Sequence, residues 1–139
     1  LQKVLEYRQQ REDQAKFAFA KAKADHEAQT VVVSNLREKL EKHELSLYSG
    51  KQLTEGDIWL WRQYRKRLVQ DLERAEMKLM ELARLMNARR RELVERSKER
   101  KLLERLRSQQ EIAFRREANA REQREYDEMA TIRYARTVY

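Results

Sequence analysis

Apolar residues recur at alternating spacings of four and three over the first third of the chain. From Leu1 to Leu47, nine of the fourteen positions at this spacing are apolar. Residues three and four apart lie on one face of a helix, so the pattern predicts a helix over about 1–48 with one buried stripe. The stripe is interrupted by five polar residues: Arg8, Glu12, His26, Gln29 and His43.

A second stripe begins at Ile58 with spacings of three and four, and predicts a helix over about 55–136. Near Leu103 and Leu106 the apolar positions shift by about one residue, and beyond Ser108 few remain. The regular part of this stripe consists of Trp61, Arg65, Leu68, Leu72, Ala75, Leu79, Leu82, Met86, Arg89 and Leu93.

The only credible break between the two stripes is at residues 49–54, which we expect to form a turn. Gly50 can take the left-handed conformation that ends a helix. Thr54 and Asp57 have the spacing of a capping box, which predicts a helix start near residue 55. The alternative is a kink at Gly50 within one continuous helix.

A short connection makes two helices antiparallel neighbours. The sequence therefore predicts an all-α fold: a two-helix antiparallel coiled-coil hairpin, in one domain over residues 1–139, with the second helix longer than the first. At 1.5 Å per residue the helices are roughly 70 and 120 Å long, so the last 30 or so residues overhang. We expect a monomer when free, with an overhang that needs a partner for stability.

Composition agrees with long helices, because the chain has no proline, two glycines and 40% charged residues. Disorder is the alternative for such a polar chain, but it does not explain periodic apolar positions. Without cysteine, disulfides and thiolate metal sites are excluded. No apolar run approaches the ~20 residues that a membrane-spanning helix needs.

The net charge of +8 is concentrated between Arg84 and Arg107, where ten basic residues face four acidic ones. This basic stretch can be a solvated helix face, a docking surface for an acidic protein or, third, a nucleic-acid site. Four glutamates interrupt it, which argues against phosphate-backbone binding. A basic stripe within this stretch consists of Arg89, Arg90, Arg91, Arg96, Lys98, Arg100 and Lys101.

Neither an enzymatic site nor a metal or cofactor site is indicated. His26 and His43 are 17 residues apart on one helix, roughly 25 Å, and cannot share a metal. There is no glycine-rich phosphate loop, and a two-helix layer offers no deep pocket. Both histidines are interpreted as polar residues tolerated in the interhelical stripe.

Large rings flank the predicted turn. Trp61 falls on the apolar stripe, whereas Trp59 is two positions away and should point outward. A two-helix tip cannot bury so many rings, and exposed Trp and Tyr are common anchors of protein interfaces. Local packing that closes the tip is the alternative. The large rings of this cluster are Tyr48, Trp59, Trp61 and Tyr64.

Four segments, in order, resemble the FliJ family of the flagellar type III export apparatus. Leu1-Gln-Lys-Val-Leu-Glu-Tyr-Arg is similar to the start of its first helix, and Trp61-Arg-Gln-Tyr-Arg-Lys-Arg-Leu68 to the start of its second. The run Ser97-Lys-Glu-Arg-Lys-Leu-Leu-Glu-Arg-Leu106 is the closest match, and Glu122-Gln-Arg-Glu-Tyr-Asp-Glu-Met-Ala130 resembles the C-terminal ending. Family members usually carry a short aromatic segment before the position of Leu1, so we expect trimming or disorder there.

The resemblance implies a stalk-like coiled coil that inserts into the ring of the export ATPase FliI, contacts the export gate FlhA and assists export chaperones. It further implies a cytoplasmic protein, peripheral at the inner membrane through its partners. The resemblance implies gate contact near Tyr48, Trp61, Tyr64 and Leu68, and ATPase contact along Arg89 to Leu106, including Leu103. The alternatives are the equivalent stalk of a virulence injectisome, a nucleic-acid-binding helical protein and a structural coiled-coil dimer.

Overall fold

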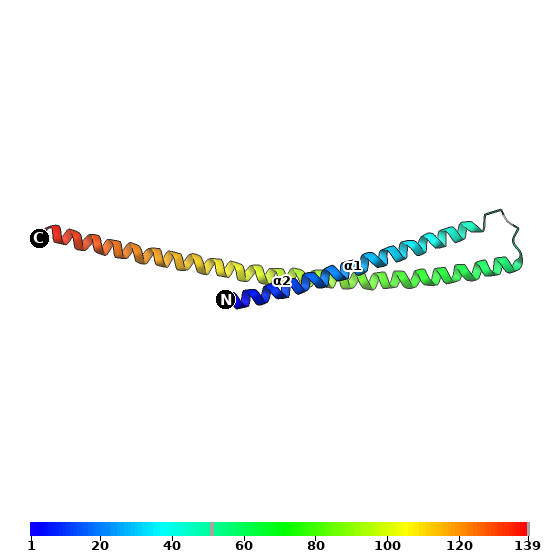
Figure 1. Cartoon of the computed structure of the whole chain (residues 1–139), viewed down its shortest axis with the longest axis horizontal. Helices are drawn as coiled ribbons and strands as arrows, with labels where there is room; N and C mark the ends of the chain where they lie inside the picture. The colour runs from blue at the N-terminus through cyan, green and yellow to red at the C-terminus, as the bar shows by residue number, and fades with distance from the viewer. Residues whose placement is uncertain (51, 139) are drawn as a thin grey trace.

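The computed structural model describes residues 1–50 and 52–138 and consists, over this part, of two long helices. Helix α1 spans Gln2–Ser46 and helix α2 spans Glu55–Val138, with 45 and 84 residues respectively. Figure 1 shows α1 running from the N-terminus to the turn, and α2 returning beside it and continuing well past the N-terminus. The predicted all-α hairpin with a longer second helix is confirmed.

The turn between the helices uses the two local features that the sequence indicated. Gly50 has a φ of 77°, the left-handed conformation that residues with a side chain rarely adopt. The Thr54 backbone N–H donates to Asp57 Oδ2 at 3.0 Å, and the Asp57 N–H donates to Thr54 Oγ1 at 3.1 Å. This reciprocal capping box starts α2 at Glu55.

The interhelical face of α1 follows the predicted stripe closely. From Leu5 to Leu47, every predicted position is buried or half-buried, including the five polar residues that interrupt the apolar pattern. Glu12 and Gln29 are only 2% and 7% exposed. Leu1, by contrast, is 52% exposed. The polar residues are therefore part of the core and need partners across the helix pair.

On α2 the stripe continues without a change of phase as far as Leu103. The spacing of three and four runs from Leu93 through Arg96 and Arg100 to Leu103, and all four are at least half-buried. The predicted shift near Leu103 and Leu106 is therefore wrong for Leu103, which is still in phase, and begins only at Leu106. Two arginines, Arg96 and Arg100, occupy interhelical positions just before Leu103, so apolar residues alone placed the shift too early. Leu106 is one position off the repeat and 43% exposed.

Beyond Leu103, α2 has no neighbour in the described part of the chain. Every side chain from 104 to 137 is exposed except Ala118, which is half-buried. This overhang of about 50 Å is visible in Figure 1 as the part of α2 beyond the N-terminus. It carries Phe114 and Tyr134 at 73% exposure each. Among the described residues, neither helix is long and apolar enough to cross a bilayer.

Candidate protein-binding surfaces

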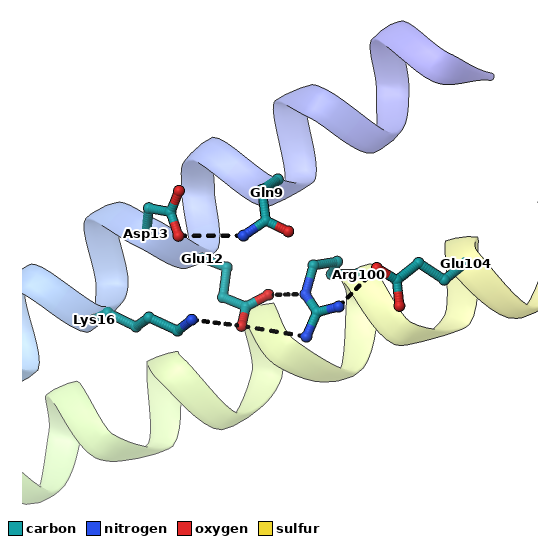
Figure 2. Close-up of polar contacts among 6 residues, drawn as sticks. All are labelled: Gln9, Glu12, Asp13, Lys16, Arg100 and Glu104. Atoms are coloured by element: carbon teal, nitrogen blue, oxygen red, sulfur yellow. Dashed lines mark hydrogen bonds and ion pairs between the residues drawn. The ribbon is translucent and has the colours of Figure 1, made fainter.

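A charged network joins the helices near the free end of the hairpin. Arg100 donates hydrogen bonds to the carboxylate of Glu12 and, at 2.8 Å, to Glu104 Oε1 (Figure 2). Lys16 Nζ lies 3.5 Å from Glu12 Oε1. Next to this group, Arg8 Nη1 donates to Glu99 Oε2 at 2.9 Å across the helix pair. The Glu12 side chain is 3% exposed and that of Arg100 19%, so this pair lies inside the interface.

Electrostatics in this network hold both groups in their charged forms. The hydrogen bond from Arg100 lowers the pKa of the Glu12 carboxyl, against the opposing effect of burial, and Lys16 lowers it further. The hydrogen bonds to Glu12 and Glu104 raise the pKa of Arg100. The sequence predicts Arg100 as a contact for a partner protein. In the structure its guanidinium is already bound to Glu12 and Glu104, and it links α2 to α1.

Two further polar residues of the α1 stripe are satisfied by backbone atoms of α2. Gln29 Nε2 donates to the Ala75 carbonyl at 2.9 Å. The His43 ring nitrogen Nε2 lies 2.9 Å from the Trp61 carbonyl, and Trp61 Nε1 donates to the His43 carbonyl at 2.9 Å. The His43 and Trp61 rings stack with centroids 4.8 Å apart, and Tyr64 meets His43 edge-on at 4.7 Å. His43 of α1 therefore joins the two helices at the tip of the hairpin through its contacts with Trp61 and Tyr64 of α2.

The rings at the turn divide into internal and external groups. Trp61 is half-buried against His43 and closes the tip, as the packing alternative stated. Tyr48 is 82% exposed and Tyr64 50%. Leu68 is 5% exposed in the interhelical face, so its side chain is not at a surface. A shallow groove at the tip is lined by Glu41, Glu44, Leu45, Leu47, Tyr48, Trp61 and Arg65.

The basic stretch of α2 is less interrupted in space than in sequence. Each of its four glutamates is in an ion pair: Glu92 with Arg89, Glu95 with Lys98, Glu99 with Arg8 and Arg96, and Glu104 with Arg100. Within the described chain, no ion pair involves Arg91 or Lys101, and both are exposed. Arg90 lies 5.5 Å from the ring of Phe19, within cation–π range.

Sequence reasoning missed how regularly the exposed cations of this stretch are spaced. Arg84, Arg91, Lys98 and Arg105 follow one another at intervals of seven residues, which was the signal available in the sequence. At about 100° per residue, they and Lys101 fall within an arc of roughly 100°. A shallow groove beside them is lined by Glu12, Lys16, Leu93, Val94, Ser97, Lys98 and Lys101. We call these five cations the basic face.

The remaining predicted residues lie around this face. Leu103 is half-buried at the end of the interhelical contact, and Leu106 is exposed just beyond it. Arg89 is exposed and held by Glu92 at 3.2 Å. Among the described residues, no group of three or more His, Asp or Glu side chains is arranged to hold a metal ion.

The sequence model described as "FliJ: Flagellar FliJ protein" matches residues 1–138 of this chain. The chain belongs to the FliJ family. It is therefore a flagellar-export-related protein, from a family of non-enzymatic export-stalk proteins. No curated protein and no solved structure matches the chain. Membership of the FliJ family suggests partners among the components of the flagellar export apparatus in general.

Proposed function

We propose that this FliJ-family chain is a stalk linking two partners in flagellar export: the ring of the export ATPase FliI at the free end, and the export gate FlhA at the turn. The observation that carries the proposal is the separation of the two candidate surfaces. The basic face lies towards the free end, and the exposed rings lie at the turn, about 50 Å away along α2.

The free end is suited to insertion into a ring. Its four glutamates are each in an ion pair, one of them with Lys98 of the basic face. The other cations of the basic face, Arg84, Arg91, Lys101 and Arg105, form no ion pair in the described chain and remain to meet acidic loops. The ion pair between Glu12 and Arg100 joins α1 to α2 at this end of the hairpin. The overhang presents exposed apolar side chains that need a partner, which the lumen of a ring can supply.

At the turn, the exposed rings of Tyr48 and Tyr64 form the proposed gate contact, beside the groove that includes Trp61. Trp61 contributes by fixing the tip through His43, and Leu68 by packing inside the hairpin. Binding through exposed aromatic residues on a preformed tip loses little conformational entropy. Contact with export chaperones, and a place at the cytoplasmic face of the inner membrane through these partners, complete the proposal.

The ATPase surface is tested by pull-down with FliI. The double variant Arg91→Glu/Lys101→Glu reverses two exposed charges that make no ion pair in the described structure, and we expect it to lose binding by at least tenfold. The matched control Lys23→Glu/Lys39→Glu makes the same change of net charge on exposed positions of α1. Unchanged binding of the first variant, or equal loss in both, sinks the assignment.

The gate surface is tested separately with FlhA. Tyr48→Ala removes an exposed ring that the hairpin does not use, so the fold is unaffected and gate binding weakens. Phe17→Ala is the control, because Phe17 is an equally exposed ring (80%) far from the turn. If both variants bind FlhA as tightly as the parent chain, the rings at the turn are not the gate contact.

A further inference from the structure

The outer side of the first turns of α2 carries an unusual combination of residues. From Ile58 to Gln70 there is no acidic residue, while Arg62, Arg65, Lys66 and Arg67 supply four positive charges. Arg65 is paired with Glu44 across the tip. The other three are exposed, and none forms an ion pair in the described part of the chain.

Exposed apolar side chains lie at the same place. Trp59 and Leu60 are each 61% exposed, and Leu53 in the turn is 41% exposed. At about 100° per residue, Trp59, Leu60, Arg62, Lys66 and Arg67 fall within an arc of roughly 160°. That arc is opposite the interhelical positions Trp61 and Leu68. These five residues with Leu53 are the tip face. Within residues 58–70 the other residues in this arc are the uncharged Gln63 and Gln70, and the acidic Glu55 and Glu73 lie in the same arc on either side of that run.

The tip face has no role in the hairpin itself. In the described chain the Trp59 side chain forms no hydrogen bond and no ring contact, whereas Trp61 is held by His43 on the other side of the helix. Two of its cations, Arg62 and Lys66, line a shallow groove together with Trp61, Arg65, Val69, Gln70 and Glu73. A surface with this composition is therefore available to something outside the chain.

We propose that the tip face binds the surface of an anionic phospholipid bilayer directly. Tryptophan and leucine partition into the interfacial zone of a bilayer, and arginine and lysine one to two turns further along bind the phosphates. Arg62, Lys66 and Arg67 lie about 4–12 Å along the helix axis from Trp59, within the depth of the headgroup region.

Two features favour lipid over nucleic acid as the occupant. The tip face presents a single tryptophan ring, whereas single-stranded nucleic acid is bound along a groove with successive stacking rings. Half of the tip face is apolar, and two of its three apolar members are leucines that offer no ring to stack on a base. A bilayer accepts both leucine and tryptophan at such a helix face.

The inference does not depend on the proposed gate or ATPase contacts. The gate contact uses Tyr48 and Tyr64, and none of the tip-face residues belongs to it. Vesicle binding is measured with the chain alone, so failure of either proposal leaves the other unaffected.

The first test is flotation of the 139-residue chain with vesicles of phosphatidylcholine, with or without phosphatidylglycerol. We expect binding only to the anionic vesicles, and a loss on the order of 100-fold in Arg62→Gln/Lys66→Gln/Arg67→Gln, since each basic side chain contributes roughly fivefold. The control Lys3→Gln/Lys21→Gln/Lys23→Gln removes the same charge from exposed positions of α1 and is expected to lose less than tenfold. Circular dichroism establishes that both variants keep their helices.

The second test uses the two tryptophans as reporters. In Trp61→Phe the remaining Trp59 is expected to shift to shorter emission wavelength on anionic vesicles, and in Trp59→Phe the remaining Trp61 is not. Absence of vesicle binding, equal losses in both triple variants, or no shift of Trp59 overturns the proposal. Binding of a single-stranded oligonucleotide that requires the same three cations, without vesicle binding, assigns the face to nucleic acid and likewise overturns it.

Discussion

Removing one partner of the Glu12–Arg100 pair is predicted to destabilise the hairpin more than removing both. Breaking a fully buried ion pair costs about 3–5 kcal/mol, because a charge is left without compensation. Arg100→Ala leaves the Glu12 carboxylate, 3% exposed, with only Lys16 at 3.5 Å, so we expect a loss of about 3 kcal/mol. Glu12→Ala leaves Arg100 with Glu104 and partial exposure of 19%, so the loss is about 2 kcal/mol.

Replacing both residues by leucine, Glu12→Leu/Arg100→Leu, removes both desolvation penalties and continues the apolar interhelical face. We expect this double variant to be within about 1 kcal/mol of the parent chain, or more stable. Urea unfolding followed by circular dichroism at 222 nm gives all of the free energies. If the two alanine variants each lose less than about 0.5 kcal/mol and their effects add, the pair does not stabilise the hairpin as argued.

The same pair predicts how stability responds to acid. The pKa of Glu12 is lowered in the folded chain from an ordinary value of 4.5. Its contribution is therefore fully present above the unfolded pKa, and is lost as the pH falls through the lower folded pKa. Between pH 5 and strong acid, the parent chain should lose more stability than Glu12→Leu/Arg100→Leu, as measured by urea midpoints. Parallel pH profiles would contradict this.

Three more predictions concern the helix contacts and the overhang. Gln29→Leu should leave the urea midpoint unchanged or raise it slightly, because a helix carbonyl such as that of Ala75 already has an intrahelical partner. A large fall in the midpoint would show instead that the hydrogen bond from Gln29 to the Ala75 carbonyl fixes the register of the two helices. Trp61→Phe should lower the free energy of unfolding by about 1 kcal/mol, because it removes the hydrogen bond to the His43 carbonyl. An unchanged melting temperature would show that this hydrogen bond does not stabilise the tip. Amide hydrogens from 108 to 138 should exchange much faster than those of the paired helices, because the overhang lacks packing; equal protection would indicate a partner, such as a second copy.

Much of the hairpin could be predicted from the sequence because its geometry is local and periodic. The spacing of apolar residues located both interhelical faces, and the positions of Gly50, Thr54 and Asp57 located the turn. The periodic pattern also placed Glu12, Gln29 and His43 in the interface, although their side chains are polar.

The partners of those polar residues could not be predicted, since they depend on which residue of α2 lies opposite. The spacing of three and four from Leu93 places Arg100 on the interhelical face and Lys101 off it, but nothing in the sequence identifies Glu12 as the partner of Arg100. The charged residues Arg96 and Arg100 also hid that Leu103 is still in phase with the repeat. Likewise, averaging charge over long segments hid the acid-free run from Ile58 to Gln70, which the structure places on one end of the rod.

The central claim, a stalk whose basic free end engages the export ATPase, is tested most directly by the rate of ATP hydrolysis by FliI as this chain is added. We expect the rate to rise with concentration and to saturate, with the parent chain and Lys23→Glu/Lys39→Glu alike and Arg91→Glu/Lys101→Glu at least tenfold less potent. A rate that the parent chain leaves unchanged, or that all three raise equally, contradicts the account.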